Sequence, residues 1–308
     1  MVGARFTSSL GLATSFAFAV AANPVSLANS VTLTPVADTT LFETTPTNNL
    51  GAEATLICGT TASGFRNRAV LKFDIAEQIP PGAVVTSATL TLTVVKVNPF
   101  TPVSATFELH RLLQPWGEGT GTGFNRGLGA TNGEATWDAR AFPNDLWSSP
   151  GAAVDTDYAA TVSSSALIDG PGGYPLPSTS ALIADVQSWL DDTNSNLGWI
   201  LVCTDEATPF TSHRLSSRES ASGAPSLLIE YTPAQSPLQI SALNSAAGKM
   251  SFQFNARAQQ TYAVEFTDAL SPPNWQTLTN IPAQSTTTNI AISIDTAGDR
   301  LFCRIRTP

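Results

Sequence analysis

Histidine is nearly absent from this chain of 308 residues, which contains only two His, three Cys and two Met. Two separated histidines without a Cys-x-x-Cys pair exclude the common zinc sites. A Gly-x-Ser-x-Gly elbow is also missing, and packing or solvation accounts for His110 and His213 more readily than catalysis does. We therefore predict that the protein is not an enzyme.

Charge is sparse as well, because Asp, Glu, Lys and Arg make up only 13% of the residues. Residues 31–232 contain nine Lys or Arg against twenty Asp or Glu, a net charge of −11, whereas residues 233–308 contain five against four, a net charge of +1. The acidic part repels phosphate backbones, which excludes nucleic acid as a partner. The two charge balances also favour two domains.

Long apolar runs are missing except at the start of the chain, where residues 10–22 carry no charge and follow Arg5. This layout is typical of a signal peptide, with small residues near Ala21 and Ala28 suited to cleavage. A buried core helix is the alternative, since the run is too short to span a bilayer comfortably. We predict a signal peptide over residues 1–28 and a secreted or cell-surface mature chain with no membrane span.

Apolar and polar residues alternate through much of the chain, which predicts short strands with one buried face. One helix is expected around residues 182–190, where apolar residues recur at helical spacing, and residues 115–173 are interpreted as loops with a few short strands. The pattern favours an all-β jelly-roll sandwich with one short helix over residues 31–232. Strands are expected at residues 31–36, 54–58, 69–74, 88–94, 105–112, 198–203 and 226–231.

A proline-bounded segment at residues 233–237 predicts a linker, and alternation restarts beyond it. Residues 238–308 have room for about seven strands of a second, smaller sandwich. Two β domains in one exported chain are therefore expected.

Short motifs in a fixed order carry a resemblance to DNRLRE-domain proteins, also called carbohydrate-binding module family 96. It covers most of residues 31–232 and implies a jelly-roll sandwich that accompanies polysaccharide-degrading or cell-surface proteins and in some members binds carbohydrate. Residues 213–219 are the nearest segment to the family's name-giving hexapeptide, which is not intact. The motifs are Ala-Asp-Thr-Thr-Leu at 37–41, Thr-Asn-Asn-Leu-Gly at 47–51, the segments 67–75 and 87–90, and later landmarks at 115–120, 135–137, 185–190, 196–198, 217–219 and 225.

Residues 238–308 more loosely resemble the immunoglobulin-like or fibronectin-like sandwiches at the ends of exported bacterial proteins. The resemblance rests on residues 262–266, Trp275 and residues 302–306. It implies a spacer rather than a binding domain.

Sugars pack on exposed aromatic faces beside planar hydrogen-bonding side chains. Trp116 and Trp147 lie in turn-rich segments and are the candidate platforms, although packing in the interior is the alternative for both. Trp189, Trp199 and Trp275 are expected in the core.

Arginine is the candidate partner for an acidic sugar. Arg66 and Arg68, with Arg214 and Arg218, would form the basic cluster that such a ligand needs. The alternative is that Arg218 pairs with Glu219 or another carboxylate and closes the sandwich.

Calcium binds loop carboxylates without a rigid motif, so a structural Ca²⁺ site formed by Asp38, Glu53, Asp155 and Asp157 stays open. Cys58 and Cys203 both end predicted strands and are the candidate disulfide; otherwise they are small buried hydrophobes, as Cys303 is expected to be.

The leading hypothesis is an exported, non-catalytic carbohydrate-binding or cell-surface protein with a polysaccharide or surface glycan as its partner. The alternative is a structural or adhesive matrix protein that assembles through its sandwich surfaces. A polysaccharide-active enzyme is the third reading, and it would need clustered polar residues with perturbed pKa values in a cleft.

Overall fold

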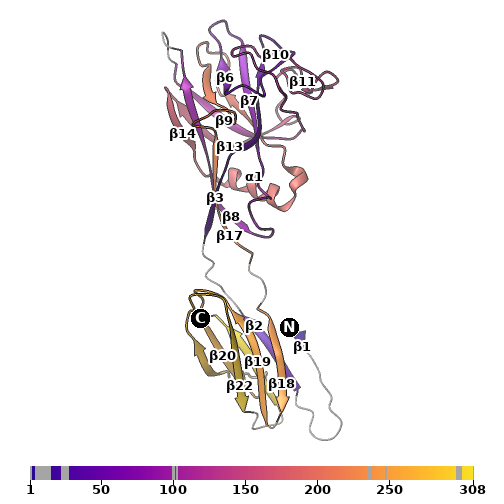
Figure 1. Cartoon of the computed structure of the whole chain (residues 1–308), viewed down its shortest axis with the longest axis vertical. Coiled ribbons are helices and arrows are strands. Elements are labelled where there is room, and N and C mark those ends of the chain that lie inside the picture. Colours follow the sequence, from indigo (N-terminus) through magenta and orange to yellow (C-terminus); the bar gives the residue numbers. More distant parts are fainter. Residues whose placement is uncertain are drawn as a thin grey trace. The chain divides into compact units, whose positions relative to one another are not determined.

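A computed structural model describes residues 2–3, 15–21, 28–98, 101, 103–234, 238–246, 248–295 and 300–307. The described chain divides into two compact units, which we call the large unit, residues 28–234, and the small unit, the remainder (Figure 1). Both are built from strands, and the prediction of an all-β fold with one short helix is confirmed. The region of the predicted signal cleavage, residues 22–27, and residues 235–237 of the predicted linker lie outside the described residues.

Eleven strands of the large unit form one continuous, curled sheet, in which β4 pairs with β7 and β14 pairs with β8 as branches from the main path. The main path runs β13-β9-β15-β7-β6-β16-β8-β17-β3. The pairs β5 with β10 and β11 with β12 form small separate ladders. The strands are β3 (Asn29–Leu33), β4 (Pro35–Phe42), β5 (Asn48–Asn49), β6 (Thr55–Thr60), β7 (Arg66–Phe73), β8 (Val84–Lys96), β9 (Ala105–Leu112), β10 (Leu128–Gly129), β11 (Ala139–Ala141), β12 (Asp145–Leu146), β13 (Tyr158–Ile168), β14 (Gly172–Leu176), β15 (Trp199–Cys203), β16 (His213–Ser216) and β17 (Ser226–Thr232).

Strand β6 connects the two halves of this sheet. Its first residues pair with β16, whereas Gly59 and Thr60 pair with β7. Gly59 has φ +103°, and a Cβ there would lie 2.3 Å from the carbonyl oxygen of Thr211. Only glycine meets both demands, so it marks the point where the strand changes partner.

The core follows the alternation of the sequence, most clearly in β8. Ala88, Leu90 and Leu92 are at most 1% exposed, whereas the threonines between them are half-buried on the other face. Burial of a leucine side chain contributes about 1.5–3 kcal/mol to folding relative to an exposed leucine. The leucines of β8 therefore stabilise the sandwich core substantially.

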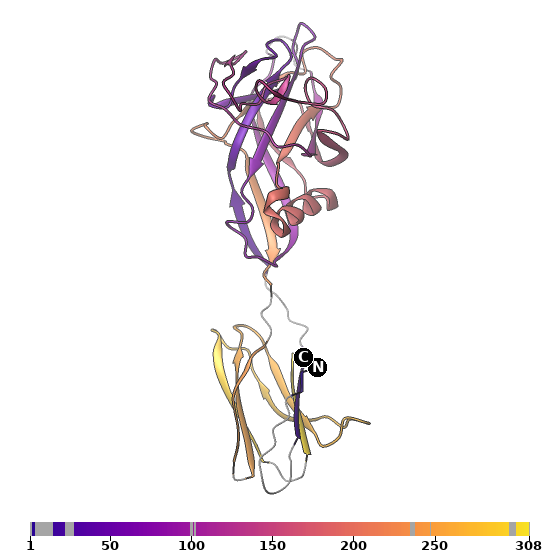
Figure 2. The ribbon, with the colours of Figure 1, turned by 90° about the vertical axis from the view of Figure 1, so that its right-hand side faces the viewer.

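The helix α1 (Ser180–Asp191) packs against β8 and β13, and Figure 2 shows it along the side of the large unit. Thr179 caps it, because the Thr179 hydroxyl accepts a hydrogen bond from the Leu182 amide. Leu182, Val186 and Trp189 form its buried face. A short 3₁₀ turn, η1 (Thr193–Ser195), follows directly.

Strand β13 is a difference from the sequence prediction, since its eleven residues lie in the stretch interpreted mainly as loops. Serines occupy buried positions on it: the Ser163 hydroxyl donates to Asp185 Oδ2, and the Ser164 hydroxyl donates to the carbonyl of Pro177. At these buried positions hydrogen-bonded hydroxyls stand where strand prediction expects apolar side chains at every second residue. The strand therefore carries no apolar alternation in its middle.

The small unit has two sheets around Phe252, Phe254 and Tyr262, each about 1% exposed or less. Cys303 is buried there as expected, whereas Trp275 is only half-buried, with the Arg304 guanidinium 4.2 Å from its ring centroid. The immunoglobulin-like identity of this unit stays a prediction. One sheet is β1-β2-β23-β20-β21 and the other β18-β19-β22, from β1 (Val2–Gly3), β2 (Ser15–Ala21), β18 (Ile240–Ala246), β19 (Lys249–Ala256), β20 (Tyr262–Thr267), β21 (Gln276–Ile281), β22 (Thr288–Asp295) and β23 (Arg300–Arg306).

Part of the predicted signal peptide lies in this unit, because β2 pairs in parallel with β23. The signal peptide itself stays a prediction. Within the described residues, none of the helices has the length and hydropathy to traverse a lipid bilayer.

Candidate functional site

A groove of about 480 Å³ lies over the outer face of β6, β16 and β8 in the large unit. The strand register places Ile57, Arg214 and Lys96 in one row across these three strands. Their sequence neighbours Leu56, Leu215 and others point to the main core, so this row faces away from it. We call this the cationic groove. It is defined by the cations Lys96, Arg126 and Arg214 and by the aromatic residues Phe65 and Phe210 in its lining.

Cations in the groove have no carboxylate within 4 Å. Among the described residues, salt bridges reach five of the nine Lys or Arg of the large unit, and three of the other four, Lys96, Arg126 and Arg214, line the groove. The groove lining also contains no Asp or Glu. His213, at its base, is 1% exposed, and burial lowers the pKa of its imidazole, so it is neutral at neutral pH. The groove is thus electropositive in a unit that is otherwise acidic.

The Arg214 side chain and the loop that carries Arg126 are held in place by the fold. Arg214 donates a hydrogen bond to Asn125 Oδ1, and its guanidinium lies 3.9 Å from the centroid of the Phe124 ring. The carbonyl of Arg126 accepts hydrogen bonds of 2.8 Å from Thr45 Oγ1 and from Asn48 Nδ2, which fix its loop against β5. Burial lowers the pKa of the Arg214 guanidinium, and the negative charge of Glu53, which forms no salt bridge with it, offsets only part of this shift.

Aromatic rings flank these charges. Phe65 is 42% exposed and Phe210 is half-buried, and both line the groove. Phe124 is 56% exposed and lies beside it on Arg214. Phe124 and Phe210 adopt φ values of +57° and +69°, which is uncommon for bulky residues and is concentrated at functional sites.

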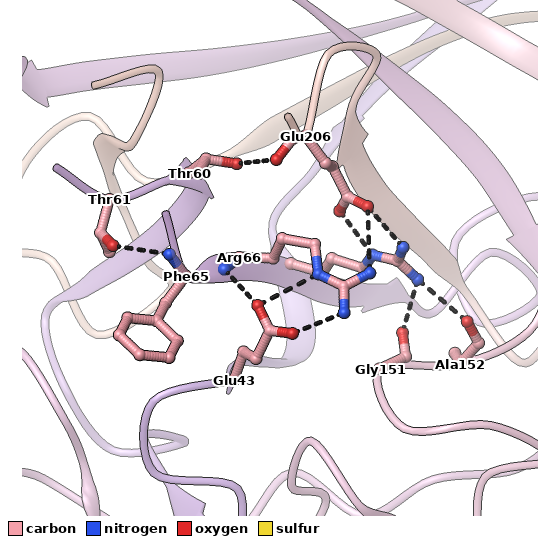
Figure 3. A network of polar contacts seen from close by, with 9 residues as sticks. Glu43, Thr60, Thr61, Phe65, Arg66, Gly151, Ala152 and Glu206 are labelled. Atoms are coloured by element: carbon pink, nitrogen blue, oxygen red, sulfur yellow. Dashed lines mark hydrogen bonds and ion pairs between the residues drawn. The ribbon is translucent and has the colours of Figure 1, made fainter. Parts of the chain in front are cut away.

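The predicted basic cluster is only partly assembled, because Arg66 and Arg68 belong to a different network. Arg66 donates to both oxygens of Glu43, and Arg68 donates to both oxygens of Glu206. Arg68 also donates to the carbonyls of Gly151 and Ala152. Figure 3 shows the hydrogen bonds of this network at Glu43, Glu206, Gly151 and Ala152. Hydrogen bonds from Arg66 lower the pKa of the Glu43 carboxyl, so these arginines are occupied structurally.

Arg218 is likewise paired, which agrees with the alternative kept open above. Its guanidinium contacts Glu118, and its Nε lies 2.8 Å from Glu219 Oε1. Its backbone amide donates to Asp38 Oδ2, which is 2.8 Å away. Asp38 is 1% exposed, and burial raises the pKa of its carboxyl to about 8, a shift to which the charges of Glu219 and Glu118 add.

Neither candidate platform tryptophan presents a fully exposed ring. Trp147 is 4% exposed, and its Nε1 donates to the carbonyl of Thr136; Trp116 is half-buried and donates to the carbonyl of Leu197. Both pack with Trp137 in a second small core beneath the loops of residues 113–157. The tryptophans are not free, because these loops pack onto the outer face of β4, β7 and β15. Trp189 and Trp199, by contrast, are fully buried as predicted.

The four carboxylates considered for calcium are not gathered at one place. Asp157 accepts hydrogen bonds from the Ser148 and Ala153 amides, Asp155 accepts from the Ala160 amide, and Glu53 accepts from the Gly123 and Phe124 amides. Asp38 lies apart from them beside Arg218. Across the described part of the chain, His, Cys, Asp and Glu side chains form no group of three or more suited to a metal ion.

Cys58 and Cys203 are both buried as free thiols. The Cys58 thiol donates to the carbonyl of Leu201 at 3.2 Å. Burial raises the pKa of both thiols, which keeps them protonated and unreactive. A disulfide between them stays a prediction.

Sequence reasoning missed Lys96, Arg126, Phe65, Phe124 and Phe210. Lys96 ends a strongly alternating strand, and its exposure was predictable, but its pairing with Arg214 required the register of β8 with β16. Phe124 stands in a Gly-rich segment, where a bulky aromatic residue is itself a signal of function.

Comparison with known families finds a match within the large unit. Residues 29–152 match the model of carbohydrate-binding module family 96. The match includes Lys96, Arg126 and Phe124 but ends before Arg214. Among curated proteins, none matches the chain.

Proposed function

Since residues 29–152 carry a domain of the carbohydrate-binding module family 96 type, we propose that the protein is exported and non-catalytic and binds an acidic polysaccharide in the cationic groove. Export is supported by the apolar leader and by the usual extracellular place of such modules. The groove is large enough for a few sugar units, because ligand sites of about 300–1,000 Å³ hold small molecules.

One observation carries the proposal, the direct pairing of Lys96 with Arg214 on neighbouring strands. Like charges directly opposite each other destabilise a sheet. The large unit has twenty carboxylates, yet none in the described residues forms a salt bridge with either side chain, and only Glu53 acts on Arg214 from farther away. A polyanion with carboxylate or sulfate groups supplies the missing counter-charges.

The aromatic walls fit the same class of ligand. Phe65 and Phe210 offer apolar faces to the C–H surfaces of sugar rings, while the three cations reach the acidic substituents. Neutral polysaccharides would use only the first of these two contacts. We therefore expect selectivity for charge in addition to binding.

The test compares polygalacturonate with its neutral methyl ester by isothermal titration calorimetry on the mature protein. We expect polygalacturonate to bind, with an affinity that falls as salt is added, and the ester to bind at least tenfold more weakly. The double variant Lys96→Ala/Arg214→Ala should lose at least tenfold in affinity. Arg140→Ala/Lys249→Ala removes two positive charges outside the groove and should bind as the wild type does. Equal binding of acid and ester, or full binding by Lys96→Ala/Arg214→Ala, would contradict the proposal.

A further inference from the structure

The segment of residues 121–127, just before β10, supplies an aromatic ring, an amide and a cation to the cationic groove. Its first and last residues, Gly121 and Gly127, are buried. A Cβ would lie 2.2 Å from the carbonyl oxygen of Asn49 at the first position and 2.3 Å from the same oxygen at the last. Only glycine allows both ends to approach β5 this closely. The ends of the segment are thus fixed, and its conformation depends on what holds the tip, residues 122–126.

Four backbone amides of the tip are paired in two different ways. The amides of Asn125 and Arg126 donate to the carbonyl of Gly123 within the turn itself, at 2.7 and 3.4 Å. The amides of Gly123 and Phe124 donate instead to Glu53 Oε2, at 3.2 and 3.1 Å. In the described part of the chain, this carboxylate is the one partner that these two amides have.

Glu53 meets the tip from a fixed position. Its carbonyl accepts a hydrogen bond of 2.6 Å from the Ser217 hydroxyl, and the amide of the preceding Ala52 donates to the carbonyl of Gly121. Successive backbone N–H groups form a concavity that suits an anion, and the Glu53 carboxylate occupies it. Its two hydrogen bonds therefore help to hold Phe124 at φ +57°, which is uncommon for a bulky residue.

The conformation of the tip determines what surrounds Arg214. The Phe124 ring centroid lies 3.9 Å from the guanidinium, and Asn125 Oδ1 accepts a hydrogen bond from it. An arginine side chain without such contacts samples many rotamers, and ordering it when a ligand binds costs affinity. A tip held by Glu53 thus keeps this cation ordered before the ligand arrives.

We propose that Glu53 is a positioning residue of the cationic groove, whose carboxylate holds the tip so that Phe124 and Asn125 fix the Arg214 guanidinium for an acidic sugar. The inference rests on the proposed function of the groove. It predicts the opposite of simple electrostatics, because the negative charge of Glu53 acts on Arg214 from beyond salt-bridge distance and also repels a polyanion. Removal of Glu53 strengthens binding if only its charge matters and weakens binding if its hydrogen bonds matter.

Two neutral substitutions of similar size separate charge from position. Glu53→Gln keeps a side-chain oxygen for the two amides, whereas Glu53→Met does not. Isothermal titration calorimetry with polygalacturonate should show Glu53→Gln binding at least as tightly as the wild type. Glu53→Met should bind roughly three- to tenfold more weakly, because the Arg214 side chain must then be ordered on binding. Glu77→Ala removes an exposed carboxylate that does not line the groove, and this control should bind as the wild type does.

A second measurement needs no polysaccharide. The Phe124 ring shifts the Nε–H resonance of Arg214 upfield in ¹H–¹⁵N spectra, because the guanidinium lies over the face of the ring. We expect this shift in the wild type and in Glu53→Gln, and its loss in Glu53→Met as in Phe124→Ala. Urea denaturation checks that the variants fold, and Glu53→Ala replaces Glu53→Met should the larger side chain prevent folding.

The two measurements distinguish failure of this inference from failure of the proposed function. An Arg214 shift that persists in Glu53→Met overturns the positioning role, whatever the polysaccharide does. So does tighter binding by Glu53→Met than by Glu53→Gln. Glu53→Met/Phe124→Ala should bind no more weakly than Phe124→Ala, because Glu53 acts through the ring, and a further loss contradicts this. Loss of the shift in Glu53→Met, with a wild type that does not bind polygalacturonate, supports the positioning of Arg214 and refutes the proposed ligand.

Discussion

The arginines of the large unit fall into two groups with opposite surroundings. Arg66, Arg68 and Arg218 each contact one or two glutamates, whereas Arg214 contacts an aromatic ring and an asparagine and has Lys96 directly across the sheet. Both groups lie in the same acidic unit. The number of carboxylates in the unit therefore does not determine which cations form ion pairs. The fold leaves Lys96, Arg126 and Arg214 without a salt bridge among the described residues.

Paired and open cations should respond differently to removal. Loss of a buried paired arginine leaves its carboxylate desolvated and alone, so stability falls. Loss of an open cation relieves repulsion and leaves stability unchanged or raised, while ligand binding falls.

The largest effect is expected for Arg68→Met. The Arg68 side chain is 9% exposed and makes four hydrogen bonds, to Glu206 and to the carbonyls of Gly151 and Ala152. Its removal leaves these acceptors unpaired in the interior, and we expect a loss of about 3–5 kcal/mol in the free energy of unfolding. Urea denaturation followed by tryptophan fluorescence measures it.

Arg66→Met is the matched control on the same strand. The Arg66 side chain is 38% exposed, so solvent screens its ion pair, and we expect a loss of about 1 kcal/mol or less. Similar losses in the two variants would show that burial does not determine how much these ion pairs contribute to the free energy of unfolding.

A smaller effect is expected from Asp38, the carboxyl beside paired Arg218. Its pKa is about 8 in the folded protein against 3.8 for the unpaired group, so the folded state keeps the proton to higher pH. The stabilisation that the proton on Asp38 adds to the folded state is fully present below about pH 3.8. It declines as pH rises and is lost above about pH 8. Between pH 5 and 7 this predicts a decline of about 3 kcal/mol in the free energy of unfolding.

Asp38→Asn removes this titration and keeps an oxygen for the Arg218 amide. The difference between wild type and Asp38→Asn isolates the effect, because Glu43 and Glu134, whose pKa values are lowered, titrate equally in both proteins. Glu219, whose pKa is raised by burial, contributes in the same direction as Asp38. A pH-independent difference between the two proteins would show that Asp38 is ionised throughout.

The sequence predicted the sandwich well where burial is apolar, as in β8 and in the face of α1 that carries Leu182 and Val186. It failed for β13, because Ser163 and Ser164 are buried through hydrogen bonds and carry no apolar signal. Periodicity records hydrophobic burial only, so strands with satisfied polar groups remain invisible to it.

For the candidate binding site, the sequence identified arginine as the residue type but not which arginines line the groove. Arg68 and Glu206 are 138 positions apart, and Arg218 and Glu118 are 100 apart. Which arginine finds a carboxylate depends on strand order and loop placement, and these are not encoded locally. Only Arg214 of the predicted cluster belongs to the groove, and its neighbour Lys96 is adjacent through register alone.

The smallest change sharpens the comparison most directly. Lys96→Glu converts the facing like charges of Lys96 and Arg214 into an opposite pair, which is worth about 0.2–1 kcal/mol between neighbouring strands. We expect the variant to unfold at higher urea concentration than the charge-neutral control Lys96→Gln, and to lose polygalacturonate binding further than that control does. If Lys96→Glu were less stable than Lys96→Gln, the repulsion between Lys96 and Arg214 would not exist in solution. Relief of this repulsion would then give no reason for an acidic ligand to bind between Lys96 and Arg214.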